Sequence, residues 1–173
     1  MLNGDIQSAT LFLAGAVGES LRARDWRIAT AESCTGGGVS AAITAIPGSS
    51  QWFEYGIVAY ANAAKQHLLN VSENNLATNG AVSEATVLQM IDGILTLSSA
   101  DIAVAVSGIA GPGGGGVDKP IGTVWFAWGS ATGERKALCR HFQGERREVQ
   151  SSAVIEALRG VLVFMEQSIK KPE

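Results

Sequence analysis

Residues 102–106, Ile-Ala-Val-Ala-Val, form an unbroken run of small apolar side chains past the middle of the chain. A run of this kind is typical of a strand that is buried on both faces, as the central strands of parallel sheets are. The segment before it, residues 84–98, has apolar side chains at the spacing of a helix, and Ser83 is placed to cap that helix. The two patterns together predict an amphipathic helix followed by a buried central strand. The apolar face of that helix comprises Val87, Met90, Ile91, Ile94 and Leu95.

Towards the N-terminus, helical and strand patterns alternate. Helices are expected over residues 8–24 and over about 35–45, where Pro47-Gly48 ends the second one. Strands are expected over residues 27–31 and 56–60. After the second strand, Asn62 is placed to cap a helix that runs to about residue 69.

Towards the C-terminus, residues 122–129 and 136–142 predict an antiparallel hairpin, and residues 146–167 predict a last helix. Strands that alternate with helices, together with this hairpin, predict a single α/β domain over residues 1–173. We expect three layers, α/β/α, with a mixed, mostly parallel sheet. The inward face of the last helix comprises Val154, Leu158, Val161, Leu162 and Met165.

The composition excludes several classes of protein. With 46% hydrophobic and 17% charged residues, the chain is too apolar for a disordered protein. Thirteen basic residues against sixteen acidic ones argue against nucleic acid as a partner. The longest apolar run near the N-terminus, residues 11–18, is too short to span a bilayer and lacks the basic segment of a signal peptide. We therefore expect a soluble cytoplasmic protein without membrane association.

A strand ends and a helix begins within residues 31–37, Ala-Glu-Ser-Cys-Thr-Gly-Gly. Such a junction exposes backbone N–H groups and the positive end of the helix dipole. It can hold a phosphate, or it can stabilise an oxyanion beside a nucleophilic Ser33 or Cys34. The alternative is a structural turn, in which the glycines serve the backbone and a hydroxyl residue caps the helix. The residue types alone leave both hypotheses open.

Lys65 falls in the first turn of the helix that Asn62 is expected to cap. A cation there faces the positive end of the helix dipole, so the position suits a lysine whose pKa has to fall. Lowering that pKa from about 10.4 to about 7.5 corresponds to about 4 kcal/mol between the two protonation states, which burial and the helix end together can supply. The alternative is an ordinary solvated lysine.

Two further segments are candidates for binding an anion. Residues 107–116, Ser-Gly-Ile-Ala-Gly-Pro and four glycines, follow the central strand, and ligands of open α/β sheets bind beyond such strand ends. Arg146, at the start of the last helix, could hold a phosphate with two hydrogen bonds. Neither a P-loop nor a dinucleotide fingerprint is present. The alternatives are a mobile glycine loop and a solvated arginine.

The two histidines, His67 and His141, have no metal-ligand spacing to each other or to the two cysteines, Cys34 and Cys139. We therefore expect no metal and no cofactor, and we expect both cysteines to be free thiols. Two histidines also offer little material for a Ser-His-Asp triad. This favours a lysine as the base for Ser33, which is a known variant of nucleophilic catalysis.

Seven motifs occur in order along the chain and together resemble the CinA C-terminal domain family over about residues 8–165. Several motifs in the right order are far more specific than any single glycine loop. The motifs are AESCTGG at 31–37, PGSSQWF at 47–53, VAYANAAK at 58–65, GAVSE at 80–84, SGIAGPGGG at 107–115, KPIGTVW at 119–125 and FQGERREV at 142–149.

This resemblance implies hydrolysis of the carboxamide of nicotinamide mononucleotide (NMN) to nicotinic acid mononucleotide and ammonia, without a metal. The family nucleophile falls on Ser33 and its lysine base on Lys65. The family's other motif residues fall on Ser50, Tyr60, Ser107 and Arg146. For the oxyanion, we expect backbone N–H donors from Thr35, Gly36 and Gly37.

The chain departs from the family pattern at Gln150, where many members carry a second arginine, and at Ala61, where many carry Ser or Thr. If both arginines hold the phosphate, affinity for NMN is lower here. The competing hypothesis is a non-catalytic nucleotide-binding or regulatory paralogue, which would use Arg146 but need neither Ser33 nor Lys65. The sequence leaves open whether Trp125, Phe126 and Trp128 build the core or the surface of a homodimer.

Overall fold

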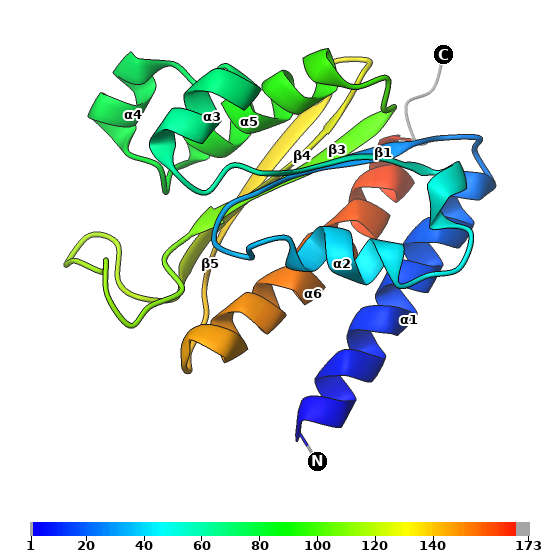
Figure 1. The fold of residues 1–173 in the computed structure, drawn as a ribbon, viewed down its shortest axis with the longest axis horizontal. Helices are drawn as coiled ribbons and strands as arrows, with labels where there is room; N and C mark the ends of the chain where they lie inside the picture. The colour runs from blue at the N-terminus through cyan, green and yellow to red at the C-terminus, as the bar shows by residue number, and fades with distance from the viewer. Residues whose placement is uncertain (1, 169–173) are drawn as a thin grey trace.

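The computed structural model describes residues 2–168 and shows a five-stranded sheet between two layers of helices (Figure 1). This arrangement confirms the predicted α/β class. The strands are β1 (Ile28–Glu32), β2 (Phe53–Val58), β3 (Ile102–Gly108), β4 (Thr123–Ser130) and β5 (Arg135–His141). The helices are α1 (Leu2–Arg22), α2 (Gly38–Thr44), α3 (Asn62–Leu69), α4 (Glu73–Asn79), α5 (Glu84–Leu97) and α6 (Arg146–Ser168), and a 3₁₀ turn covers Ser49–Gln51.

The strands lie in the order β2-β1-β3-β4-β5. β1 pairs in parallel with both β2 and β3, whereas β4 pairs antiparallel with β3 and β5. The sheet is therefore mixed, as predicted, and among the described strands β4 alone runs against the other four. The apolar run at residues 102–106 forms most of β3, which is the middle strand and is buried throughout that run. The carboxyl ends of β1, β2 and β3 thus meet at one edge of the sheet.

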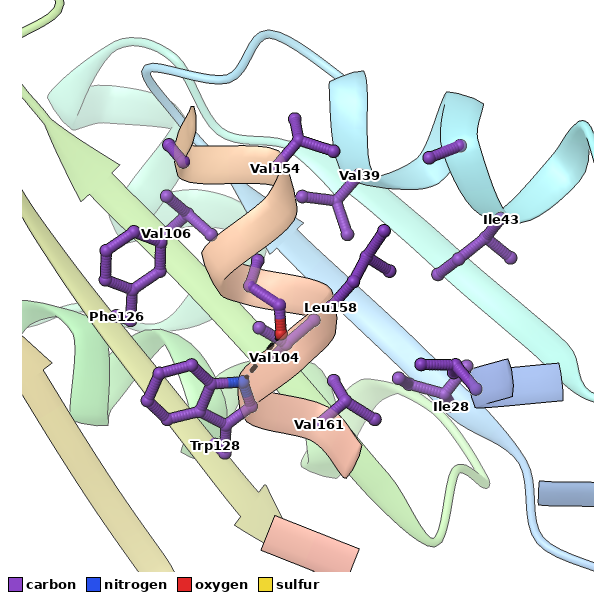
Figure 2. Packing of buried hydrophobic residues seen from close by; sticks show 14 of the residues in the cluster. Ile28, Val39, Ile43, Val104, Val106, Phe126, Trp128, Val154, Leu158 and Val161 are labelled. Atoms are coloured by element: carbon purple, nitrogen blue, oxygen red, sulfur yellow. Dashed lines mark hydrogen bonds between the residues drawn. The ribbon is translucent and has the colours of Figure 1, made fainter. Parts of the chain in front are cut away.

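The two faces of the sheet carry side chains of different size. One face presents branched and aromatic residues such as Val104 and Val106 to α1, α2 and α6, and Figure 2 shows them beside Leu158 of α6. On this face the Trp128 indole N–H donates to the backbone oxygen of Ala157 at 3.0 Å (Figure 2). The other face presents alanines to α3 and α5, and small side chains allow a helix to approach a sheet closely. These alanines are Ala29, Ala31, Ala103, Ala105 and Ala127.

The starts of three helices test the capping predictions. Ser83 caps α5 as predicted, because its hydroxyl accepts from the Thr86 N–H at 3.2 Å. Asn62 does not cap α3: it is the first helical residue, and Ala61 precedes it in an extended conformation without a side-chain cap. α4 is absent from the prediction because its sequence, ENNLATN, contains too few apolar residues to show a helical period.

Several element boundaries also differ from the prediction, and the differences at α1 and β2 are the ones that matter most here. α1 begins at Leu2 rather than at residue 8. β2 covers Phe53–Val58 rather than residues 56–60, so Ala59 and Tyr60 follow the strand instead of ending it. The Ala59 N–H still donates to the Glu32 backbone oxygen at 2.8 Å, whereas the carbonyls of Ala59 and Tyr60 are available for contacts outside the sheet. Within the described residues, no helix is both long enough and apolar enough to cross a membrane.

Candidate active site

The edge at which the parallel strands end carries a small cavity of about 240 Å³. Segments far apart in sequence meet there, because β1, β3 and the start of α6 all reach this edge. The lining comprises Ala81, Val82, residues of the glycine loop from 108 to 114, and the side chains of Ser33, Cys34, Tyr60, Lys65, Ser107 and Arg146. A larger hollow of about 490 Å³ lies between α1, α2 and α6, but Arg147 is the only charged residue in its lining. The smaller cavity therefore holds the candidate chemistry.

Ser33 and Lys65 come together at the floor of this cavity. The Lys65 Nζ lies 3.0 Å from the Ser33 Oγ, and the exposed fractions of the two residues are 1% and 7%. Nζ also donates to the backbone oxygens of Ala59 and Tyr60, at 2.8 and 3.1 Å. These are the two residues that directly follow β2. The lysine is thus held by two carbonyls and one hydroxyl.

The environment of Lys65 contains no counter-ion. None of the ion pairs among residues 2–168 includes this lysine. Burial lowers the pKa of Lys65 from its ordinary value, because the ammonium form loses its water, and the nearby Cys34 opposes this shift only in part. The sequence predicted the lowered pKa but attributed part of it to the first helical turn. Lys65 is the fourth residue of α3, and its own N–H already bonds to Ala61.

Close packing on the alanine-rich face sets the position of α3. A Cβ at Gly93 of α5 would collide with the backbone of Leu69, so α3 and α5 can lie this close only because residue 93 is a glycine. Leu69 and Val71 are buried at the end of α3. The Val71 N–H donates to the Lys65 backbone oxygen at 3.1 Å and closes this end of the helix. Packing against α5 therefore fixes the position of the helix that carries Lys65.

Backbone hydrogen bonds fix the turn on which Ser33 lies. Its N–H donates to the Val106 oxygen at 2.9 Å, and its carbonyl accepts from the Gly36 N–H at 3.0 Å. Gly37 has a φ of 94°, a left-handed conformation that favours glycine, and α2 begins directly after it. The turn therefore leads from the end of β1 into α2 and presents the Ser33 hydroxyl to the cavity.

The predicted oxyanion donors Thr35, Gly36 and Gly37 do not line the cavity. The Gly36 N–H is used by Ser33, and the Thr35 hydroxyl donates to the Glu32 carboxylate at 2.7 Å. The turn thus engages the Gly36 N–H, whereas the N–H groups of Thr35 and Gly37 donate to no other group within residues 2–168. Their role as oxyanion donors stays a prediction.

Glu32 is a functional candidate that the sequence analysis did not single out. Its side chain is completely buried, and its carboxylate accepts four hydrogen bonds from the turn and from α2. The sequence signal was an acidic residue at the end of a strand whose other residues are uncharged. Because burying a carboxylate is costly unless its oxygens are hydrogen-bonded, such a residue has a specific structural task.

Arg146 and Tyr60 form the outer wall. The Arg146 guanidinium donates to the Tyr60 hydroxyl and to the Gly111 backbone oxygen, each at 2.8 Å. Both side chains are exposed to solvent. One turn further along α6, the Gln150 amide donates to the Cys34 backbone oxygen at 2.8 Å. Arg146 therefore faces the cavity, whereas Gln150 supports the turn that carries Ser33.

Of the two other predicted hydroxyl residues, the structure brings only one to the site. Ser107, at the end of β3, is buried and donates to the Ala81 backbone oxygen at 2.7 Å. Ser50 is exposed in the 3₁₀ turn that precedes β2, so it lies at the opposite edge of the sheet and outside the cavity lining. Ser107 thus holds the Ala81–Val82 wall, and the fold does not place Ser50 near Lys65.

Cys34 lies next to Ser33 and is also buried in the lining. Burial raises the pKa of its thiol to about 12, chiefly because the thiolate would lose its water. A thiol with so high a pKa is a poor nucleophile at neutral pH. Among the described residues, no group of three or more His, Cys, Asp or Glu side chains is arranged to hold a metal ion.

Comparison with known proteins places this geometry in a family. The model of the CinA C-terminal domain matches residues 11–165. Two curated relatives are named nicotinamide-nucleotide amidohydrolase PncC. The one from Pseudomonas putida is 50% identical over 153 residues, covering 87% of this chain and 93% of its own length. The one from Escherichia coli K12 is 49% identical over 152 residues, covering 88% and 92%.

A solved structure has the same fold. The competence/damage inducible protein CihA from Agrobacterium tumefaciens superposes with a TM-score of 0.88 at 40% identity, covering 91% of this chain and 96% of that one. The family model covers nearly all of the described residues, including every residue that lines the cavity. The chain with this buried serine–lysine pair belongs to the CinA C-terminal domain family.

Proposed function

We propose that this protein is an amidohydrolase that converts NMN to nicotinic acid mononucleotide and ammonia, with Ser33 as nucleophile and Lys65 as its base. The observation that carries the proposal is the 3.0 Å contact between the Lys65 Nζ and the Ser33 Oγ in a buried cavity. The names of the PncC relatives support the substrate, since they match nearly the whole chain.

The contacts of Lys65 fit a neutral amine. A neutral amine has two N–H donors and one lone pair. With its donors on the carbonyls of Ala59 and Tyr60, its lone pair faces the Ser33 hydroxyl. Burial stabilises this form because it disfavours the charged one, which is the direction of the pKa shift. Lys65 is therefore ready to accept the hydroxyl proton.

Acylation then proceeds in two parts. Ser33 Oγ attacks the carboxamide carbon while its proton passes to Lys65, and a tetrahedral oxyanion forms. When the C–N bond breaks, Lys65 returns that proton to the departing nitrogen, and ammonia leaves. The nicotinoyl group remains as an ester on Ser33.

Deacylation repeats the sequence with water. Lys65 accepts a proton from the attacking water, the ester C–O bond breaks, and the proton returns to the Ser33 oxygen. The products are the carboxylic acid and the free hydroxyl, so no metal, oxidant or cofactor is required.

The glycine loop is our candidate for the oxyanion donors. Ala110 and Gly111 line the cavity, and their backbone N–H groups donate to no other group within residues 2–168. Removing a single oxyanion donor in comparable sites costs about 2.7–4 kcal/mol. Arg146, on the same side, is our candidate for the phosphate, because a guanidinium can bind two phosphate oxygens at once.

The test is ammonia release from NMN by the purified protein. We expect turnover by the wild type and nearly complete loss in Ser33→Ala. The double variant Ser33→Ala/Lys65→Ala should be little worse than either single variant, because residues that act as a unit are not additive. A protein that binds NMN without releasing ammonia would be a nucleotide-binding paralogue. Retained activity in Ser33→Ala would exclude the proposed nucleophile.

A further inference from the structure

Glu32 lies at the junction between β1 and α2, one residue before Ser33, and none of its surface is exposed. Its Oε2 accepts from the Thr35 hydroxyl at 2.7 Å and from the Val39 N–H at 3.0 Å. Its Oε1 accepts from the N–H and the hydroxyl of Ser40, at 2.8 and 2.6 Å. One carboxylate thus contacts both the turn and the first residues of α2.

These four bonds use the carboxylate completely. Thr35 lies within the turn, whereas Val39 and Ser40 lie beyond it, so the side chain bridges the beginning and the end of the segment that presents Ser33. Ser40 is itself held by a 2.7 Å hydrogen bond to Thr30 of β1. The segment cannot move relative to β1 without breaking several of these contacts.

Part of the task of Glu32 is structural, because the Val39 and Ser40 N–H groups in the first turn of α2 have no partner within the helix and donate to this carboxylate. None of the ion pairs among the described residues includes Glu32, so hydrogen bonds alone offset its loss of hydration. The other residues of β1 carry no charge. The distinguishing feature of position 32 is its connection to the turn that presents the nucleophile.

We propose that Glu32 is a positioning residue for Ser33: by bridging Thr35 with Val39 and Ser40, it holds the turn so that Oγ stays within reach of Lys65. Glu32 does not line the cavity, and it acts through the backbone rather than on the substrate. This inference deepens the proposed function and rests on it for the identity of the reaction.

The direct test is Glu32→Gln, which keeps the shape of the side chain but replaces one acceptor oxygen by an NH₂ donor. Small displacements of a reacting group reduce rates strongly, so we expect kcat for NMN to fall by about tenfold to 100-fold. KM should stay within about twofold, because no substrate contact is lost. The pH profile of kcat should keep its position, because Lys65 is unchanged. An unchanged kcat, or a shifted pH profile, would overturn the proposal.

A matched control separates positioning from general loss of stability. Trp128→Phe also removes one buried hydrogen bond, the 3.0 Å bond to Ala157, on the sheet face that packs against α6. We expect this variant to lose stability with little change in kcat. If it loses as much kcat as Glu32→Gln at equal loss of stability, Glu32 has no particular role.

If Glu32→Gln does not fold, Thr35→Val provides the second variant. It removes one of the four bonds and preserves the shape of the side chain. We expect kcat to fall by about threefold to tenfold with an unchanged KM, in line with the loss of one ordinary hydrogen bond. An unchanged kcat in this folded variant would contradict the proposal.

A fluorophosphonate probe makes the test independent of the substrate. Ser33 Oγ forms a bond to phosphorus, fluoride leaves, and the hydroxyl proton passes to Lys65 and then to solvent. Mass spectrometry locates the adduct, and Ser33→Ala is the blank. Slower labelling of Glu32→Gln than of wild type supports the positioning role even if NMN proves to be the wrong substrate. Equal labelling rates would refute it.

Discussion

The two sides of Ser33 bury opposite kinds of ionisable group. On the α2 side, the Glu32 carboxylate accepts four hydrogen bonds and lacks only a counter-ion. On the cavity side, the Lys65 amine has two carbonyls and one hydroxyl, and burial lowers its pKa. The first environment fixes an anion in place. The second favours loss of a proton.

This difference teaches how one short turn can be both rigid and reactive. Four donors compensate the buried carboxylate, so its energy is lowest in a single geometry. A neutral Lys65 amine can donate to both carbonyls, so its contacts do not require a positive charge. The amine can therefore gain and lose a proton. Rigidity comes from the α2 side and reactivity from the cavity side. Substitutions on the two sides should therefore affect the enzyme differently.

The largest expected effect is the loss of the base itself. Lys65→Met and Lys65→Arg should each lower kcat by about 100- to 10,000-fold, the usual contribution of general acid–base catalysis. Arginine offers hydrogen-bond donors like lysine, but its guanidinium is always charged and cannot act as a base. Ammonia release from NMN measures both variants. Substantial activity in Lys65→Arg would show that the residue acts as a cation and not as a base.

The next largest effect is expected at Arg146, the residue that we propose binds the phosphate. Arg146→Ala should raise the KM for NMN by about 10- to 100-fold, because a hydrogen bond to a charged group contributes about 1.5–3 kcal/mol. The penalty for nicotinamide riboside, which lacks the phosphate, should be smaller. Arg147→Ala is the matched control, since Arg147 lines the other hollow. Equal losses on both substrates would contradict a phosphate role.

The difference in stability between the wild type and Lys65→Met should depend on pH, because the pKa of Lys65 is lowered in the fold. In the unfolded chain the lysine keeps its ordinary pKa of 10.5, and in the fold that pKa is lowered. Between the two values the unfolded state binds more protons, so folding becomes more favourable as pH rises, by at most about 1.4 kcal/mol per pH unit. In urea unfolding, the free energy of unfolding of the wild type should therefore rise relative to that of Lys65→Met as the pH increases. A pH-independent difference would mean that the lysine stays charged when buried.

Gln150 of α6 supports the turn that carries Ser33, and Gln150→Ala should lower kcat modestly. It removes the 2.8 Å bond to the Cys34 backbone oxygen, and one such bond contributes about 1 kcal/mol, or about fivefold in rate. We expect the loss in kcat rather than in KM, which steady-state kinetics with NMN will separate. A loss confined to KM would indicate that Gln150 contacts the substrate.

The smallest effect is expected at Cys34. Cys34→Ala should change kcat by less than about threefold, because a buried thiol with a raised pKa is chemically inert. Thiol reagents at neutral pH should likewise leave wild-type activity intact. Inactivation by such reagents that Cys34→Ala prevents would place the thiol in the reaction path.

Local signals in the sequence were sufficient for the fold class, whereas the pairing of Ser33 with Lys65 was assigned from the family resemblance. The run at 102–106 predicts β3, the helical period of residues 84–98 predicts α5, and Ser83 predicts its cap. The sparse histidines directed attention to a lysine base for Ser33. Each of these inferences uses residues close in sequence or one strong composition signal.

The remaining features depend on contacts between distant segments. The short polar sequence of α4 has no apolar period, so the helix depends on its packing against α5 and on the Ser72 cap, whose hydroxyl accepts from the Asn75 N–H. No local signal predicted that the Thr35 hydroxyl and the Val39 N–H of α2 both donate to the buried Glu32 carboxylate. Ser50 shares a motif with the family but lies at the opposite edge of the sheet. The order of motifs along the chain does not predict at which edge of the sheet a residue lies.

The alanines on one face of the sheet have a consequence for how the enzyme can evolve. Ala31 and Ala105 lie in the same buried cluster as Leu69 of α3 and Ile91 of α5, so their size bears on how closely these helices approach the sheet. A single added methylene group at Ala31 or Ala105, both fully buried, would act as a spacer and push the helix outward. The position of Lys65 thus depends on methyl groups that line no part of the cavity. We therefore expect larger side chains at these two positions to lower activity.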